Sequence, residues 1–113
     1  MLKRILYRLQ NRLVRSYGND IDFETLVRMF RNNGKVFVID VRTEDEYRFY
    51  HIDGAINIPL QDLKDKIEKV VKDKSNIVIA YCQYGGRSRK ACIKMEKMGY
   101  MNVYNLKNGL DGI

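Results

Sequence analysis

The sequence predicts an α/β protein with three layers, in which helices cover both faces of an open, mainly parallel sheet. Residues 36–39 and 77–81 are continuous apolar runs, which are typical of parallel strands buried on both faces. Strand-like runs alternate along the chain with segments of helical periodicity, and this alternation favours α/β over α+β. We expect a basic amphipathic N-terminal helix within residues 1–19 and one domain over residues 20–113.

The elements before the second apolar run follow in order. Leucine and isoleucine form one stripe over residues 2–15, which predicts the first helix. Asp22 is expected to cap a second helix that ends at Gly34. After the strand at 36–39, Thr43 is expected to cap a short helix that continues to Phe49. Residues 55–58 then read as a shorter strand.

The second half repeats the alternation. Asp62 is expected to cap a helix whose inner stripe is formed by Leu63, Ile67, Val70 and Val71. The strand at 77–81 follows, and a helix is expected after Ser88, with Gly99 as its left-handed stop. Residues 103–106 read as the last strand.

Composition narrows the class of protein. A chain of 113 residues fits one domain, and two cysteines ten positions apart do not suggest a secreted disulfide scaffold. One histidine with two cysteines gives no recognised metal-ligand spacing, so we expect neither a metal nor a cofactor. No apolar run reaches the roughly 20 residues that cross a bilayer, and Arg8 and Arg12 interrupt any signal-peptide core. We therefore expect a cytoplasmic protein.

The net charge of +7 is unevenly distributed, because five basic residues and no acidic residue precede Asp20. A basic amphipathic helix over residues 2–15 could lie on an anionic membrane surface, meet a protein partner, or pack on its own domain. We favour packing, because the apolar stripe would otherwise stay exposed. The basic segment lacks the interleaving of aromatic residues that a base-stacking site would show, so no nucleic-acid partner is expected.

The loop after the strand at 77–81 carries the most functional information. Cys82 stands at the end of the strand and is followed by Gln83, Tyr84, Gly85, Gly86, Arg87 and Ser88. Open α/β sheets bind ligands outside the carboxyl ends of their strands, and the following helix adds N–H donors and partial positive charge there. Such surroundings favour the thiolate, which is the reactive form of cysteine. Cys82 is therefore a candidate nucleophile; the alternative is a small apolar residue that finishes a core strand.

Three ordered motifs resemble those of single-domain rhodaneses, which are thiosulfate and persulfide sulfurtransferases of a Cdc25-like α/β fold. They are the cysteine loop, Asp40-Val41-Arg42 with Glu46 and Tyr47 after it, and His-Ile-Asp-Gly-Ala-Ile-Asn-Ile-Pro at 51–59. The resemblance spans roughly residues 20–112. Two positions depart from the family pattern: Tyr50 replaces the usual glycine, and Asn108-Gly109 replaces a glycine pair followed by tryptophan.

The resemblance implies sulfur transfer through a Cys82 persulfide. The donor would be thiosulfate or a persulfide and the acceptor a thiol or cyanide; a protein could also donate or accept the sulfur. Backbone N–H groups of residues 83–87 would stabilise the negative sulfur, and Arg87 would orient an anionic donor. The alternatives are a sulfur carrier without turnover or a partner-binding module. Phosphatase or arsenate reductase activity is disfavoured, since those related loops place five residues between cysteine and arginine, whereas this loop has four.

Other polar residues are assigned to structural support. Asp40 and Arg42 are expected to anchor neighbouring loops through hydrogen bonds, and Glu46 to form a local ion pair with Arg42. His51 is expected to be structural, since a persulfide-forming thiolate needs no general base. Ser88 is expected to cap the helix after the loop. Cys92 is expected to pack inward; the alternative is that it resolves a Cys82 persulfide as a disulfide.

Overall fold

The structure is a computed structural model that describes residues 19–32 and 34–113. Within these residues, five parallel strands form one sheet in the order β1-β5-β4-β2-β3. The strands are β1 (Asp20–Ile21), β2 (Val36–Asp40), β3 (Ile56–Asn57), β4 (Ile77–Tyr81) and β5 (Asn102–Leu106). No helix in this described part of the chain is long and apolar enough to span a membrane.

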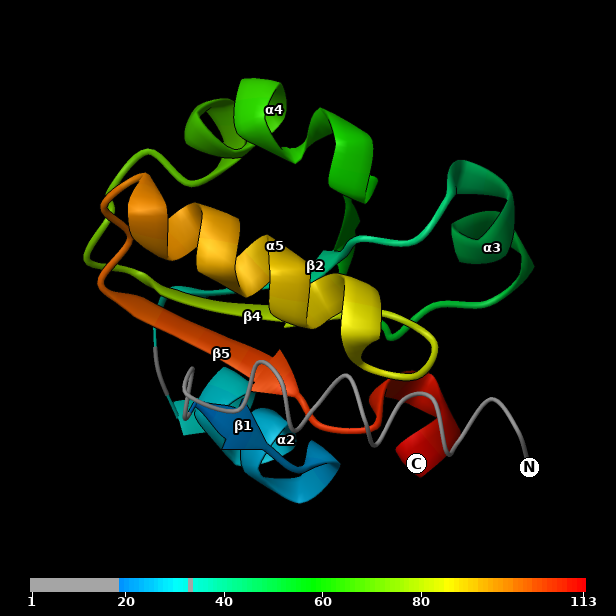
Figure 1. Cartoon of the computed structure of the whole chain (residues 1–113). Coiled ribbons are helices and arrows are strands. Elements are labelled where there is room, and N and C mark those ends of the chain that lie inside the picture. Colours follow the sequence, from blue (N-terminus) through cyan, green and yellow to red (C-terminus); the bar gives the residue numbers. More distant parts are fainter. Residues whose placement is uncertain (1–18, 33) are drawn as a thin grey trace.

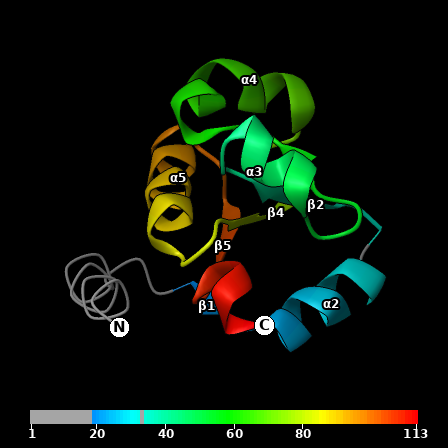
Figure 2. The same ribbon diagram turned by 90° about the vertical axis from the view of Figure 1, so that its right-hand side faces the viewer.

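Helices cover both faces of the sheet (Figure 1). α4 (Leu63–Val70) and α5 (Gly86–Lys97) lie on one face, and α2 (Phe23–Asn32) lies on the other, as the turned view also shows (Figure 2). Three short elements complete the domain: α3 (Glu44–Phe49) and the 3-10 turns η2 (Leu60–Asp62) and η3 (Gly109–Gly112). The predicted three-layer α/β fold is thus confirmed. The helix expected over residues 2–15 lies outside the described residues.

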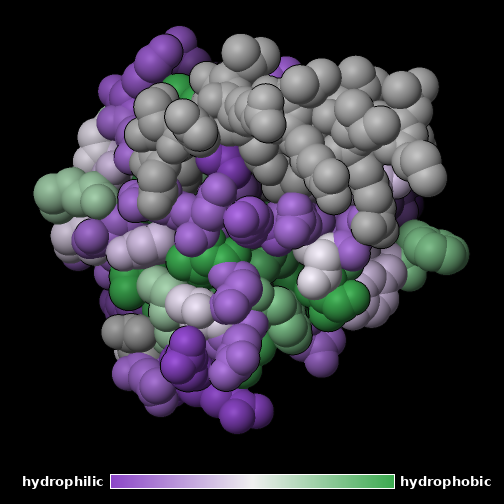
Figure 3. Space-filling model, turned by 60° about the horizontal axis from the view of Figure 1, so that its bottom comes forward, coloured by the Kyte–Doolittle hydropathy of each residue, from purple (hydrophilic) through white to green (hydrophobic). Residues whose placement is uncertain are grey.

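The alternation of side chains along the strands divides the core into two clusters, because successive residues of a strand point to opposite faces. Ile39, Val78 and Ala80 pack with Cys82 beneath α4 and α5. Val38, Ile79 and Tyr81 pack on the α2 side with Leu26. Seen from that side, apolar side chains gather in the middle of the face and hydrophilic ones border them (Figure 3). Cys82 therefore continues the alternation of β4 and points towards α5.

Two of the four predicted N-terminal caps are present. The Asp22 carboxylate accepts a hydrogen bond from the Thr25 N–H at 2.8 Å, and Thr43 forms a capping box with Glu46 at the start of α3. The cap predicted for Asp62 is wrong: Asp62 precedes α4, but its side chain makes no capping hydrogen bond. The preceding turn η2 already holds its backbone in a helical conformation, whereas a capping residue needs an extended one.

Strand order determines where the site lies. β4 is central, with β5 on one side and β2 on the other. The segments that follow these three strands therefore meet at one edge of the sheet, and α3 and η3 also lie there (Figures 1 and 2). Two stretches distant in the sequence, those that follow β2 and β5, thus lie beside the loop after β4.

Candidate active site

The Cys82 side chain lies at the bottom of the loop between β4 and α5 and is 1% exposed. The backbone N–H of Gly85 points at its Sγ atom at 3.0 Å, and the N–H of Ser88 at 3.4 Å. The Ser88 Oγ is also 3.4 Å from the sulfur. The two N–H donors, together with the N-terminal end of α5, favour negative charge on the sulfur. The arrangement is suited to hold a thiolate or a terminal persulfide sulfur.

The loop joins α5 earlier than the sequence predicted. The helix begins at Gly86, and Gly85 is the residue that precedes it, with φ 106°. Glycine adopts this left-handed backbone without steric cost, and the turn brings the Gly85 N–H onto the sulfur. The cap predicted for Ser88 is therefore wrong, because Ser88 lies inside the first turn. The N–H donors also differ from the expected residues 83–87, since that of Ser88 is included.

A series of buried polar contacts runs from the sulfur to β1, the edge strand of the sheet. The Ser88 Oγ lies 2.5 Å from the Oδ1 of Asn105 in β5, and the Nδ2 of Asn105 donates to Asp20 in β1 at 2.9 Å. Asp20 in turn forms an ion pair with Arg89, which is 1% exposed. This series of contacts fixes the rotamer of Ser88, and thereby the polar surroundings of Cys82.

The turn η3 supports the other side of the loop. The N–H of Leu110 donates to the carbonyl of Cys82 at 3.0 Å, and the N–H of Asp111 donates to that of Gln83 at 2.9 Å. Gly109 makes this contact possible: it has φ 57°, and a Cβ atom there would lie 2.3 Å from the Cys82 carbonyl oxygen. The C-terminal turn thus holds the backbone of the nucleophile candidate directly.

Arg87 is paired across the loop with Glu46 of α3. Its Nη1 and Nη2 atoms donate to the two carboxylate oxygens of Glu46 at 2.7 and 3.0 Å. The hydrogen bonds and charge of Glu46 raise the pKa of Arg87, although burial opposes this, and Cys82 makes a smaller contribution in the same direction. The local pair predicted between Glu46 and Arg42 is replaced by this contact, because Arg42 turns to Asp40 instead.

The Glu46 pair makes stability depend on acid pH. The hydrogen bonds from Arg87 lower the pKa of Glu46 from 4.5 to about 2. A carboxyl whose pKa is lower in the folded state contributes stability that is present above about pH 4.5, declines below it and is lost as the pH falls through about 2. We therefore expect the free energy of unfolding at about pH 6 to be higher for the wild type than for Glu46→Gln. The difference should be about 1 kcal/mol or less, because the pair is partly exposed, and it should shrink at about pH 3.

Urea unfolding of both proteins at the two pH values measures this difference. The variant Arg87→Gln, which removes the partner that lowers the Glu46 pKa, should show the same weaker acid dependence. A difference between wild type and Glu46→Gln that is equally large at both pH values would contradict the assignment.

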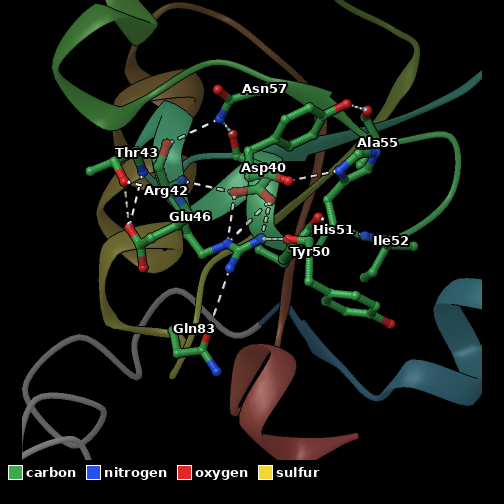
Figure 4. A network of polar contacts seen from close by, with 12 residues as sticks. Asp40, Arg42, Thr43, Glu46, Tyr50, His51, Ile52, Ala55, Asn57 and Gln83 are labelled. Carbon is green, nitrogen blue, oxygen red and sulfur yellow. Dashed lines mark hydrogen bonds and ion pairs between the residues drawn. The ribbon is translucent and has the colours of Figure 1, made fainter.

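Asp40 and Arg42 hold the neighbouring segments together (Figure 4). The Arg42 guanidinium donates to the Asp40 carboxylate at 2.8 Å through Nη2, and Nη1 reaches Gln83 in the cysteine loop at 3.4 Å. Arg42 also donates to the carbonyl oxygen of Tyr50, and Asn57 donates to the carbonyls of Asp40 and Arg42. Burial alone would lower the pKa of Arg42, but the hydrogen bonds and charge of Asp40 outweigh it and raise the pKa.

The remaining residues named from the sequence lie around this core. The His51 ring stacks on Tyr47 with centroids 3.7 Å apart, and its Nδ1 lies 2.9 Å from the Tyr47 carbonyl oxygen. Tyr84 is half-buried in the loop. Cys92 is buried in α5, where its Sγ lies 3.4 Å from the carbonyl oxygen of Tyr104. A redox role for Cys92 remains a hypothesis.

Fold and site together define a class: a parallel α/β domain whose thiol is cradled where the central strand meets a helix. A sequence profile of the Rhodanese-like domain family matches residues 22–113. The chain belongs to this rhodanese-like family, as its motifs predicted. In three-dimensional structure it is similar to a rhodanese with anions from E. coli, with 39% sequence identity and a TM-score of 0.65 over 70% of this chain and 92% of that one.

Its curated relatives include sulfurtransferases. It is 43% identical to thiosulfate sulfurtransferase PspE of Escherichia coli over 59% of this chain and 64% of that protein, so it spans somewhat less than two thirds of that relative. It is 32% identical to a sulfurtransferase of Allochromatium vinosum over 81% of this chain and 84% of that protein. A tRNA uridine(34) hydroxylase of Buchnera aphidicola is 34% identical, and there the match covers 76% of this chain but only 29% of that protein.

Several contacts of the site could not be predicted from the sequence. Glu46 had a local signal, since it completes a capping box with Thr43, but that signal gives no reason to pair it with Arg87. Asn105 reads as an ordinary polar position on a strand. Gly109 departs from the family pattern in the sequence, but its contact with Cys82 depends on how the turn η3 packs against the loop.

Proposed function

We propose that this protein is a sulfurtransferase that moves a sulfane sulfur from thiosulfate or a persulfide to a thiol or cyanide through a persulfide on Cys82. The observation that carries the proposal is the convergence of the Gly85 and Ser88 N–H groups on the Cys82 sulfur. These donors would stabilise negative charge on a terminal sulfur, as an oxyanion hole does for oxygen. The sulfurtransferases among its relatives support the same reaction class.

The chemistry would proceed in two displacements. The Cys82 thiolate attacks the outer sulfur of the donor, forming a new S–S bond while the bond to the rest of the donor breaks. The electron pair leaves with the donor, as sulfite from thiosulfate or as a thiolate from a persulfide. A thiol or cyanide then attacks the outer sulfur of the Cys82 persulfide, and the Cys82 thiolate is the leaving group. Gln83, Tyr84, Gly85, Gly86, Arg87 and Ser88 would line the path of the donor, with Asp40, Arg42 and His51 as support.

Intact-mass spectrometry tests this proposal. After incubation with thiosulfate or an alkyl persulfide, the protein should gain about 32 Da, one sulfur atom, on Cys82. Addition of cyanide or a thiol should remove the extra mass. If no donor adds sulfur to Cys82, the proposed function is wrong and a partner-binding module takes its place.

A second candidate is a sulfur carrier that accepts sulfur but does not turn over. It is favoured by one observation: the matching segment occupies only 29% of the hydroxylase relative, so related domains also occur as parts of larger proteins. Steady-state thiocyanate production separates the two candidates. An enzyme gives many turnovers, whereas a carrier gives about one equivalent of product per Cys82.

A further inference from the structure

The arginines that flank the cysteine loop each contact a carboxylate. Arg42 pairs with Asp40 at 2.8 Å and Arg89 pairs with Asp20, and both arginines are almost fully buried. Arg87 is the exposed member of the three, with 39% of its side chain accessible, and it forms two hydrogen bonds with Glu46. A sulfur donor that approaches the loop therefore meets an ion pair with no net charge instead of a free guanidinium.

The Glu46 carboxylate is also held independently of Arg87. The backbone N–H of Thr43 donates to its Oε1 at 3.0 Å, and the Thr43 hydroxyl lies 3.1 Å from the same oxygen. These contacts belong to the capping box of α3, so the negative charge stays beside the loop even when Arg87 turns towards a ligand. Because its pKa is about 2, Glu46 carries this charge throughout the neutral pH range.

A fixed negative charge discriminates between anionic donors by their charge. The Coulomb energy between Glu46 and a donor is proportional to the charge of the donor, so a dianion is repelled twice as strongly as a monoanion at the same distance. Thiosulfate carries two negative charges, whereas an ionised alkyl persulfide carries one on its sulfur. Glu46 also competes for Arg87, the cation best placed to bind a sulfonate oxygen.

We infer that Glu46 is a specificity-determining residue that disfavours thiosulfate and favours sulfane-sulfur donors with a single negative charge, such as alkyl persulfides. The inference rests on the proposed sulfur transfer through Cys82. Glu46 does not take part in the displacement itself. It sets how strongly Arg87 can hold the leaving group of the donor, which is sulfite for thiosulfate and a less charged thiolate for a persulfide.

The test compares two donors that differ mainly in charge: thiosulfate and the methanethiosulfonate anion. In both, the Cys82 thiolate attacks the outer sulfur, and the electron pair leaves with sulfite or methanesulfinate. The rate of sulfur loading on Cys82 is measured by intact mass for the wild type and for Glu46→Gln. Glutamine at this position keeps the capping box, so α3 should remain folded.

Glu46→Gln should raise the loading rate about tenfold for thiosulfate and about threefold for methanethiosulfonate, since the logarithm of the gain scales with donor charge. The difference should shrink in high salt, which screens charges at a partly exposed site. Glu44→Gln is the matched control: it removes the same charge from the same helix, but Glu44 pairs with Arg48, and the ratio of the two rates should stay at the wild-type value.

The outcomes separate this inference from the proposed function. If every protein loads sulfur and Glu46→Gln leaves the ratio of thiosulfate to methanethiosulfonate rates unchanged, the specificity role is overturned and the sulfurtransferase proposal stands. An equal change of the ratio in Glu44→Gln would also overturn it, since the effect would then be general electrostatics. If neither donor loads sulfur onto the wild type, the proposed function itself fails.

Discussion

Replacement of Cys82 by serine is expected to abolish sulfur transfer and to leave the fold nearly unchanged. A serine hydroxyl is a much weaker nucleophile than a thiolate at neutral pH, and the proposed mechanism assigns none of the described residues as a base that would activate it. We expect the rate of thiocyanate formation from thiosulfate and cyanide to fall at least about a thousandfold. The hydroxyl oxygen can accept the hydrogen bonds that Gly85 and Ser88 direct at the sulfur, so the free energy of unfolding should change by less than about 2 kcal/mol.

Cys92→Ala provides the matched control, since it removes the second buried thiol of the same domain. This variant should keep sulfur transfer, with a loss of stability limited to that of a small cavity. Full thiocyanate production by Cys82→Ser would refute Cys82 as the nucleophile. Loss of turnover in Cys92→Ala, with the fold intact, would instead indicate that Cys92 resolves the persulfide.

Gly109→Ala should impair both stability and activity, although residue 109 lies 27 positions after Cys82 in the chain. A Cβ atom at this position would lie 2.3 Å from the Cys82 carbonyl oxygen and 2.7 Å from the Gln83 carbonyl carbon. Both neighbours are backbone atoms, so either the cysteine loop moves or η3 separates from it and loses its two hydrogen bonds. We expect a destabilisation of about 2 kcal/mol or more, because overpacking adds to the cost of a left-handed backbone.

The loss of activity should exceed what stability alone explains. A displacement of the nucleophile by a fraction of an ångström changes its alignment with the N–H donors, and we expect at least about a tenfold lower rate at temperatures where the variant is folded. Thermal unfolding and thiocyanate formation measure the two effects. Gly34→Ala is the control: among the described residues other than its chain neighbours, no atom lies within 4 Å of its added Cβ, and its stability should change by less than about 0.5 kcal/mol. A Gly109→Ala protein with wild-type melting and rate would show that η3 does not hold the loop.

The site thus depends on a framework built from both ends of the described domain. β1 supplies Asp20, which holds Asn105, and Asn105 holds the Ser88 hydroxyl beside the sulfur. The C-terminal turn holds the carbonyls of Cys82 and Gln83. Truncation of either end of this region would therefore affect the cysteine loop through its backbone and its first helical turn, without removing a residue of the loop itself.

Local sequence determined most of the longer elements of the fold and the position of Cys82, but not the short strand β1. The apolar runs predicted β2 and β4, helical spacing predicted α4 and α5, and the Asp22 and Thr43 caps were placed correctly, because each depends on residues within a few positions. The start of α5 was missed by three residues, since the loop glycines allow the turn to close before Ser88. Asp62 failed as a cap because the preceding 3-10 turn already occupies its backbone.

Only the tertiary structure decided which groups surround the sulfur. Arg87 meets Glu46 across 41 positions, and Asn105 meets Asp20 across 85, because β4 lies between β5 and β2 and the carboxyl ends of parallel strands share one edge. No local pattern encodes such a pair: the sequence predicted a local ion pair of Glu46 with Arg42 and a donor-orienting role for Arg87. The identity of the nucleophile candidate was therefore readable from the sequence, whereas its electrostatic surroundings and the turn that holds it arise from the order of the strands.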